Sequence, residues 1–163
     1  MTFLFSKAST ADAPAVFRLI LERVRWMNTV GLHQWNDTGY LEAYPESYYA
    51  KQAERGRLYI LKQDGTICGA AVLLTEDSRW PDRPEPALYV HNLVAACGAK
   101  GAGSALLQHA ENLARAKGKA YLRLDCAVDN ADLNRYYESR GFMPAGVCTD
   151  GPYTGNRREK ALA

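Results

Sequence analysis

A glycine-rich turn, residues 98–104, constrains the fold of this chain more than any other stretch of its sequence. An apolar strand signal over Ala87–Ala95 precedes the turn, and an amphipathic helix that ends near Lys117 follows it directly. Small residues let a ligand approach the backbone closely, and the first turn of a helix presents unpaired N–H groups and a partial positive charge. The turn therefore indicates either a site for a phosphorylated ligand or a tight turn that binds nothing.

Two common phosphate-binding motifs do not fit this turn. A Walker loop ends in Gly-Lys-Ser/Thr, whereas Gly103 and Ser104 are adjacent, with no lysine between them. A dinucleotide fingerprint has Gly or Ala three residues after its second glycine, and Leu106 occupies that position. Binding of a nucleoside triphosphate or a dinucleotide is therefore disfavoured.

The patterns around the turn predict a mixed α/β fold in one domain, residues 1–163. Apolar residues at three- and four-residue steps after Ser9 predict a helix that ends before Gly31, and the pair Asp64-Gly65 is typical of a hairpin turn. The other expected elements are strands at residues 2–6, 58–61, 67–74, 121–127, 143–148 and 158–162, and helices at residues 45–55 and 130–140. Their order is strand, two helices, three strands, helix, strand, helix and two strands.

Three segments are predicted to lack regular structure. Residues 32–44 mix aromatic and polar side chains without a clean period, residues 76–86 hold three prolines and Trp80, and residues 149–156 are rich in glycine. We expect an irregular loop, an exposed loop and a loop between two closing strands, respectively.

Composition and cysteine spacing exclude several classes of protein. A net charge of +2 is too small to indicate nucleic acid or an anionic membrane, and no apolar run approaches the ~20 residues of a membrane span. The N-terminus shows no signal peptide, so we expect a cytoplasmic protein. Without C-x-x-C spacing or nearby histidine pairs, the cysteines are expected to be buried free thiols rather than metal ligands or disulfides. They are Cys68, Cys97, Cys126 and Cys148.

Asn130 and Tyr137 strengthen the ligand-binding interpretation of the turn. An Asx residue at the end of a strand suits a helix N-cap, and Tyr137 lies two helical turns further on, on the same face. Tyr137 is either a core aromatic residue or a phenol that faces a ligand as a proton donor. Periodicity alone leaves both roles open.

Taken together, these motifs resemble the GNAT superfamily of acetyl-coenzyme A-dependent N-acetyltransferases. The matching residues are Leu93-Val94-Ala95 at a strand end, Gly101 and Gly103 in the family's Gln/Arg-x-x-Gly-x-Gly/Ala turn, and Asn130, Tyr137 and Gly141-Phe142 downstream. Gly98 departs from the family pattern, because it stands where the family usually has Gln or Arg. The resemblance is strong over residues 88–146 and looser elsewhere.

The resemblance implies a mostly antiparallel sheet of about seven strands flanked by about four helices. It also implies that the strand end at residues 93–95 diverges from its neighbour, and that Tyr137 protonates the departing thiolate. The amine attacks the thioester directly, so neither a covalent enzyme intermediate nor a metal is implied. The residues implied in binding acetyl-coenzyme A are Leu93, Val94, Ala95, Ala99, Lys100, Gly101, Ala102, Gly103, Ser104, Asn130 and Tyr137.

The acceptor amine must also lose a proton. His91 is one candidate base, because histidine titrates near neutrality, although a purely structural role for this strand histidine stays open. Glu76, Asp77 and Asp150 are alternatives, and so is a relay through water.

The acceptor, a small-molecule amine or a peptide N-terminus, is expected to contact segments outside the cofactor core. These are Trp26, the loop of His33 to Tyr40 with Trp35, Trp80, and the loop of residues 149–156 with Asp150. Aromatic rings and carboxylates suit a cationic amine, whereas Trp26 and Trp35 could instead pack the first helix.

A rival interpretation is a non-catalytic acyl-coenzyme A sensor or subunit of the same fold. Gly98 favours it, and the intact pair of Asn130 and Tyr137 argues against it. A homodimer is compatible with either function.

Overall fold

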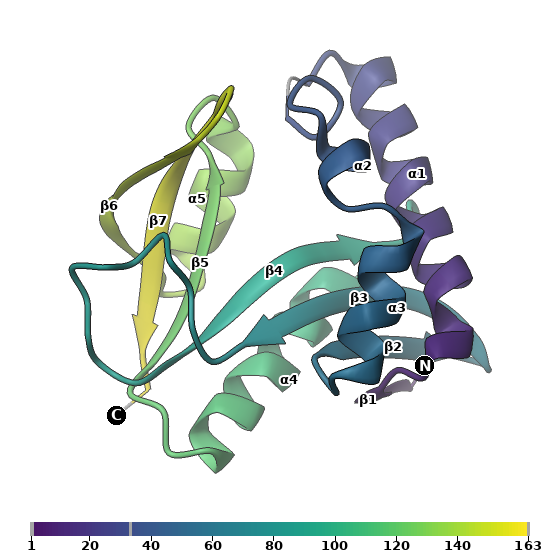
Figure 1. Cartoon of the computed structure of the whole chain (residues 1–163), viewed down its shortest axis with the longest axis horizontal. Helices are drawn as coiled ribbons and strands as arrows, with labels where there is room; N and C mark the ends of the chain where they lie inside the picture. The colour runs from purple at the N-terminus through teal and green to yellow at the C-terminus, as the bar shows by residue number, and fades with distance from the viewer. Residues whose placement is uncertain (1, 33, 163) are drawn as a thin grey trace.

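The computed structural model describes residues 2–32 and 34–162, whose strands form one seven-stranded sheet (Figure 1). The strands are β1 (Phe3–Lys7), β2 (Leu58–Gln63), β3 (Thr66–Leu74), β4 (Ala87–Ala95), β5 (Tyr121–Ala127), β6 (Met143–Asp150) and β7 (Tyr153–Ala161). Their order is β1-β2-β3-β4-β5-β7-β6, and every neighbouring pair except β4 and β5 is antiparallel. The predicted mixed α/β fold with a mostly antiparallel sheet is confirmed.

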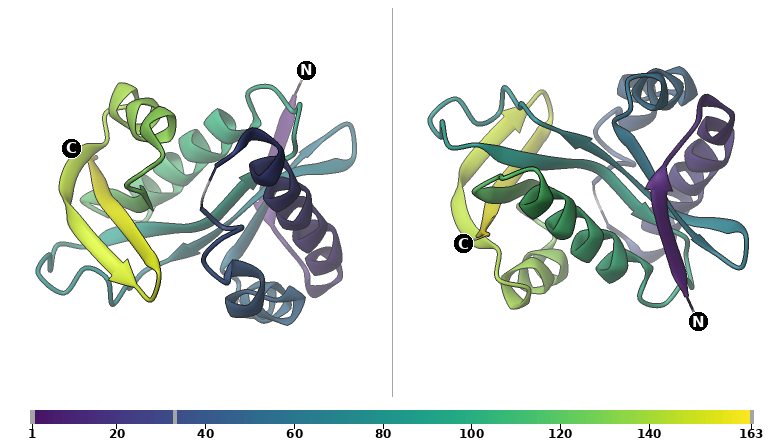
Figure 2. Two further views of the ribbon diagram at one scale, coloured as in Figure 1. Left: turned by 90° about the horizontal axis from the view of Figure 1, so that it is seen from above. Right: turned by 90° about the horizontal axis from the view of Figure 1, so that it is seen from below.

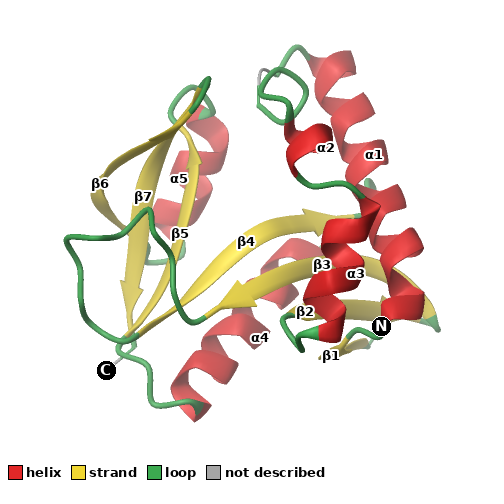
Figure 3. Ribbon diagram, in the orientation of Figure 1, coloured by secondary structure: helices red, strands yellow, loops and turns green. Residues whose placement is uncertain are grey.

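Helices cover both faces of the sheet (Figure 2). They are α1 (Ala13–Val30), α2 (Tyr40–Ala43), α3 (Glu46–Glu54), α4 (Ala102–Ala116) and α5 (Ala131–Ser139), with a 3-10 turn at Thr10–Asp12. α1 and α3 pack on one face against β2, β3 and β4, and α4 crosses the other face. The prediction of about four helices misses α2, a single helical turn inside the segment that was predicted to be irregular (Figure 3).

β4 and β5 are paired only where they begin. Residues 87–89 lie opposite residues 121–123, and the described part of the chain contains no further pairs between these two strands. Beyond that point β4 continues against β3 and β5 continues against β7, so the strands diverge. The divergence expected at residues 93–95 is confirmed, and it leaves one edge of β4 without a strand partner.

The β3–β4 loop, residues 75–86, is held against the other half of the sheet by a buried arginine. The side chain of Arg123 on β5 is fully buried and binds the carboxylates of Glu159 at 2.9 Å and Glu85 at 2.8 Å. Because Glu85 belongs to the loop and Glu159 to β7, one guanidinium group joins three segments of the chain.

Trp80, at the centre of this loop, is buried rather than exposed. Its side chain is 3% exposed, and its ring lies 5.0 Å from the guanidinium carbon of Arg123 and 4.7 Å from that of Arg157. The prediction of an exposed loop is therefore confirmed for most of residues 76–86 but is wrong at Trp80. The sequence of the loop does not reveal the reason, which is that two distant arginines provide cation–π partners for the indole.

The closing hairpin is longer than predicted. β6 extends to Asp150 and β7 begins at Tyr153, so a two-residue turn of Gly151 and Pro152 replaces the predicted loop of residues 149–156. Once Asp150 pairs with Tyr153 across this turn, the polar residues that follow continue the antiparallel ladder.

Glu111 on α4 is 7% exposed, and it binds Lys160 at 2.6 Å and Arg115 at 2.5 Å.

The prediction that the cysteines are buried free thiols needs one correction. All four cysteines are free, and Cys97 is exposed, whereas the other three are buried as predicted. Cys97 differs because it follows the last residues of β4, at the open end of the sheet.

Among residues 2–32 and 34–162, no helix has the length and apolar character that crossing a lipid bilayer requires. In the same residues, no group of three or more His, Cys, Asp or Glu side chains is arranged to hold a metal ion.

Replacement of Arg123 with Met should lower the free energy of unfolding by about 3 kcal/mol, because the largely buried carboxylate of Glu159 then loses one of its two cationic partners. Arg135→Met is the matched control: Arg135 is 68% exposed and, among the described residues, pairs with Asp132 alone, so its loss should change stability by less than about 0.5 kcal/mol. Urea unfolding of both variants checks the difference, and equal effects would contradict it.

Candidate active site

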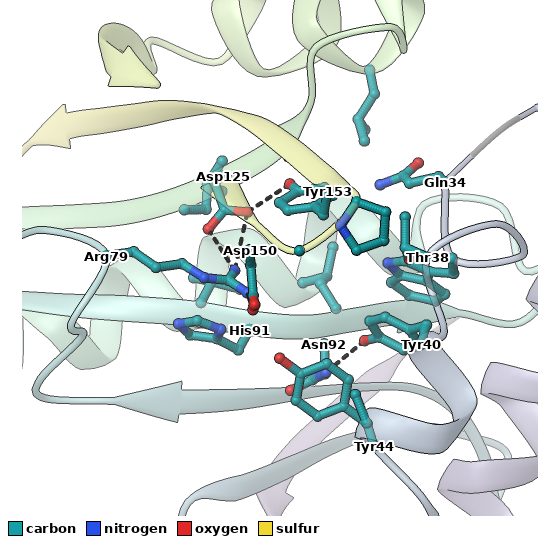
Figure 4. Close-up of a pocket in the computed structure, with 18 of the residues that line it drawn as sticks. Gln34, Thr38, Tyr40, Tyr44, Arg79, His91, Asn92, Asp125, Asp150 and Tyr153 are labelled. Carbon is teal, nitrogen blue, oxygen red and sulfur yellow. Dashed lines mark hydrogen bonds and ion pairs between the residues drawn. The ribbon is translucent and has the colours of Figure 1, made fainter. Parts of the chain in front are cut away.

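A cavity of about 240 Å³ opens where β4 and β5 diverge (Figure 4). Its lining comes from the segment between α1 and α3, the β3–β4 loop, β4, β5, α5 and the β6–β7 turn. It gathers six residues that the sequence had indicated: Trp35, Tyr40, His91, Leu93, Tyr137 and Asp150. The expected proton donor, the candidate base and part of the expected acceptor region therefore share one cavity.

His91 lies on β4 at the floor of this cavity and is bound to Asp77 of the β3–β4 loop. Its Nε2 is 2.7 Å from Oδ2 of Asp77, whose side chain is 6% exposed. Burial opposes ionisation of Asp77, but the hydrogen bond and charge of His91 outweigh it and hold the pKa of Asp77 below its usual value. Asp77 is therefore a carboxylate at neutral pH.

Arg79 extends from the same loop and bridges two carboxylates at one end of the cavity. It lies 3.3 Å from Asp125 and 2.7 Å from Asp150, and the Tyr153 hydroxyl donates to Asp125 at 2.6 Å. Burial alone would lower the pKa of Arg79, but the two carboxylates raise it above its usual value. Since the carboxylates outnumber the guanidinium group, this end of the cavity suits a cation.

Aromatic rings form the wall at the other end of the cavity. Trp35 stacks on Tyr40 with ring centres 4.3 Å apart, and Tyr40 contacts Tyr44 at 4.8 Å. Figure 4 shows Tyr40 on this wall, away from Arg79 and Asp125, whereas Tyr44 extends from the wall toward Arg79. Their faces suit contact with a cationic or flat group. His33, which begins the predicted acceptor loop, lies outside the described residues.

Asn92 lines the cavity from a bulge in β4. The register with β3 shifts between Ala70 and Val72, and Asn92 has a φ of 54°, in the left-handed region. Its Nδ2 donates to the Tyr40 hydroxyl at 2.5 Å and its Oδ1 accepts from the Tyr48 hydroxyl at 2.9 Å. Sequence reasoning missed Asn92, although an asparagine inside an apolar strand is itself a signal, because asparagine tolerates this conformation.

Tyr137 lies where α5 meets the cavity, next to Leu124 and Leu133. Its ring also packs against Phe142 at 5.7 Å, so Tyr137 is at once a core residue and a lining residue. Burial, with a smaller contribution from Cys126, raises the pKa of Tyr137 well above its usual value. The phenol therefore keeps its proton at neutral pH, as a general acid must.

The glycine-rich turn leaves backbone donors at the start of α4 without acceptors. Gly98 and Gly101 have φ values of 86° and 84°, and α4 begins at Ala102. Within the described residues, no protein group accepts from the N–H of Gly101, Gly103 or Ser104, and the first turn of α4 holds no acidic residue. An anion placed here would meet three N–H groups and the positive end of a helix.

Arg140, at the end of α5, reaches this same turn. Its Nη1 donates to Oγ of Ser104 at 2.8 Å, and no carboxylate of the described residues pairs with it. A guanidinium group at the positive end of a helix is unfavourable until an anion arrives, so Arg140 fits a phosphorylated ligand. Sequence reasoning missed Arg140, since the contact spans 36 residues and has no local signal.

Asn130 has the capping role expected of it. Its Oδ1 accepts from the N–H of Leu133 at 3.1 Å, which fixes the start of α5. Its Nδ2 donates to Oε1 of Gln34 at 3.2 Å, and Gln34 lines the cavity while Asn130 does not.

Other indicated residues lie beside the cavity. Val94 is 2% exposed and packs with the core under α1, and the carbonyl of Ala95 accepts from Arg23 at 2.8 Å. Trp26, on α1, is 39% exposed, lies 4.7 Å from the guanidinium carbon of Arg23 and does not line the cavity. The structure therefore brings Trp35 but not Trp26 to the aromatic wall of the cavity.

Comparisons with known proteins agree with this geometry. The sequence model of the acetyltransferase (GNAT) family matches residues 25–142 of this chain. The N-acetyltransferase YesJ of Bacillus subtilis, itself uncharacterised, is 26% identical over 148 residues, which cover 86% of this chain and 81% of YesJ. A GNAT-family acetyltransferase structure from Listeria monocytogenes superposes with a TM-score of 0.81 at 24% identity, covering 98% of this chain and 95% of that one. PaiA N-acetyltransferase from Thermoplasma acidophilum, solved with coenzyme A, gives 0.78 at 20% identity and covers 99% of each chain. The chain belongs to the GNAT family of acetyltransferases.

Asn92→Ala should lower the free energy of unfolding by about 1–3 kcal/mol, because it removes two hydrogen bonds and forces an alanine into the left-handed region. Asn92→Gly removes the same hydrogen bonds but adopts that conformation freely, so it should be the less damaging change. Urea unfolding of the two variants measures the difference. A glycine variant as unstable as the alanine variant would show that the backbone conformation is unimportant.

Proposed function

We propose that this protein transfers an acetyl group from acetyl-coenzyme A to a primary amine within a ternary complex. The observation that carries the proposal is the placement of Tyr137 and His91 on one cavity, at the point where β4 leaves β5. A protonated phenol and an imidazole at this point supply the two proton transfers that amide formation from a thioester needs. The coenzyme A complex of the Thermoplasma relative supports the choice of donor.

Acetyl-coenzyme A would bind between the diverging strands. We assign its pyrophosphate to the N–H groups of residues 99–104, with Lys100 and Arg140 supplying positive charge. The unpaired edge of β4 at residues 93–95 would bind the pantetheine arm, and Asn130 would lie near the thiol end. In this arrangement Arg140 takes the place of the long side chain that is missing at Gly98.

The proposed chemistry depends on His91 and Tyr137, which both line the cavity. His91 takes a proton from the acceptor ammonium, so that the nitrogen has a lone pair when it attacks the thioester carbon. The C–N bond forms while a backbone N–H at the β4 bulge polarises the carbonyl oxygen, and the C–S bond then breaks. Tyr137 gives its proton to the thiolate and recovers one through water from the amide nitrogen. One proton per turnover leaves through His91.

The buried cysteines support direct transfer. Burial raises the pKa of Cys126 and of Cys148 to about 11 each, so both are protonated thiols at neutral pH and poor nucleophiles. Because all four cysteines are free, a reducing compartment suits the protein, and we propose that it works in the cytoplasm.

The acceptor side of the cavity favours a cationic amine. Asp125 and Asp150 offer negative charge at one end, and Trp35 and Tyr40 offer aromatic faces at the other. A small-molecule amine or the N-terminus of a peptide meets this requirement.

The test is thiol release from acetyl-coenzyme A with a panel of primary amines, diamines and short peptides, followed by mass analysis of the acetylated product. We expect saturable release with at least one amine, together with thermal stabilisation by acetyl-coenzyme A alone. Stabilisation without release from any amine would favour the non-catalytic sensor. Absence of stabilisation would remove the assignment of the donor.

Tyr137→Phe should lower kcat by about 10²–10³-fold and leave the affinity for acetyl-coenzyme A nearly unchanged, because it removes the proton donor but keeps the ring. Tyr136→Phe is the matched control, since Tyr136 is the neighbouring tyrosine, is 37% exposed and does not line the cavity. Steady-state kinetics decide, and an unchanged kcat for Tyr137→Phe would remove it from the acid role.

Arg140→Gln should weaken the binding of acetyl-coenzyme A by about tenfold, the loss of one charge-assisted contact to phosphate. Arg135→Gln on the same helix is the control, because Arg135 pairs with Asp132 and is exposed. Calorimetry measures both affinities. S-acetylpantetheine, which lacks the pyrophosphate, should bind wild type and Arg140→Gln equally well. Tighter binding to wild type would show that the effect of Arg140 does not come from a contact with the pyrophosphate.

A further inference from the structure

His91 and Asp77 have the geometry of a base held by a carboxylate. Nε2 of His91 is 2.7 Å from Oδ2 of Asp77, and the two side chains are 15% and 6% exposed. His91 lines the cavity, whereas Asp77 lies behind it, outside the lining. Oδ1 of Asp77 accepts from the backbone N–H of Arg79 at 2.9 Å, so both carboxylate oxygens are engaged and the orientation of the carboxylate is fixed.

The loop that carries Asp77 is also fixed. Three residues further on, Trp80 packs against Arg123 and Arg157, and the guanidinium group of Arg157 binds both carboxylate oxygens of Asp82 at 2.7 and 3.0 Å. These contacts tie the loop to β5 and β7. Asp77 therefore approaches His91 from a rigid support rather than from a mobile segment.

We propose that Asp77 is a positioning residue that makes His91 the general base of acetyl transfer. A carboxylate at Nε2 accepts the ring N–H there and leaves Nδ1 with the free lone pair. When Nδ1 takes the proton of the acceptor ammonium, the imidazolium lies next to a buried carboxylate that stabilises its charge. This role rests on the acetyltransferase function proposed above.

Other ionisable groups surround His91, and none of those in the described residues bonds to its ring. The charged groups and phenols that line the cavity with His91 are Tyr40 and Tyr44 from the segment between α1 and α3, Arg79 from the loop, Asp125 from β5, Tyr137 from α5, and Asp150 and Tyr153 from the β6–β7 hairpin. Arg79 is paired with both aspartates, and burial raises the pKa of each of these tyrosines.

The other carboxylates near the loop are weaker candidates for a role in proton transfer. Glu76 is exposed and does not line the cavity, so it cannot reach an acceptor bound there. Asp150 lines the cavity but is 65% exposed and already binds Arg79 at 2.7 Å. Asp77 itself faces His91 rather than the cavity, which suits it to orient a base and not to act as one.

The experiment is a double-mutant cycle of Asp77→Asn, His91→Gln and the double variant in the full chain, with kcat/KM for the amine measured against pH. Asp77→Asn should lower the plateau value of kcat/KM by about 10–100-fold, which is part of the ~10²–10⁴-fold that a positioned base contributes. It should also move the acidic limb of the kcat/KM profile to lower pH. Added to His91→Gln, it should cost little more. The affinity for acetyl-coenzyme A should not change in any variant.

Glu76→Gln is the matched control, because it removes the adjacent, exposed carboxylate and should leave the pH profile unchanged. The proposal is overturned if the acidic limb of the kcat/KM profile stays in place in Asp77→Asn. It is also overturned if the loss of kcat/KM caused by Asp77→Asn adds in full to the loss caused by His91→Gln. If Asp77→Asn does not fold, Asp77→Ser replaces it, since a hydroxyl can still accept the Arg79 N–H, and the same outcomes apply.

A second readout does not depend on turnover. Nitrogen-15 spectra above neutral pH should show the Nε2–H tautomer of His91 in wild type and a mixture of tautomers in Asp77→Asn. If wild type and Asp77→Asn show the same tautomers of His91, that result alone overturns the positioning role. Failure of the wild-type protein to acetylate any amine would instead overturn the proposed function, so the two failures can be told apart.

Discussion

The site depends on one constraint in the sheet: β4 and β5 run parallel, and their described residues pair only between 87–89 and 121–123. Each strand then stays with its antiparallel neighbour, so the two halves of the sheet separate. The separation frees an edge of β4 and opens the cavity between His91 on one side and Tyr137 on the other. Complete pairing of β4 with β5 would close both the cavity and the route between the strands.

Charge is distributed unevenly about this opening. Arg140 and the free N–H groups of α4 place positive charge at one end, whereas Asp125 and Asp150 place negative charge at the other. Between them the lining is apolar near Leu124. Under the proposed function, a phosphorylated donor and a cationic acceptor would each be attracted to their own end, and the neutral reacting groups would meet where neither charge dominates.

How much the sequence could predict depended on the range of the interaction. The cap at Asn130, the hairpin at Asp64-Gly65 and the turn before α4 are set by neighbours within a few residues, so local patterns predicted them. The family resemblance added the cavity role of Tyr137. The bonds of Asp77 to His91 and of Arg140 to Ser104 join segments 14 and 36 residues apart, and the burial of Trp80 needs arginines from two other strands. No periodicity encodes such contacts, because they exist only once the sheet has formed.

The two ends of the cleft between the sheet halves are closed by very different contacts. At the end where β4 and β5 pair, the β3–β4 loop crosses from one half to the other and is held by the buried Arg123. At the far end, the bond between Gln34 and Asn130 joins the two halves with a neutral amide contact of 3.2 Å, worth on the order of 1 kcal/mol. In the described residues the two halves are therefore joined by buried ionic contacts where the strands pair, and by a neutral hydrogen bond where they are apart.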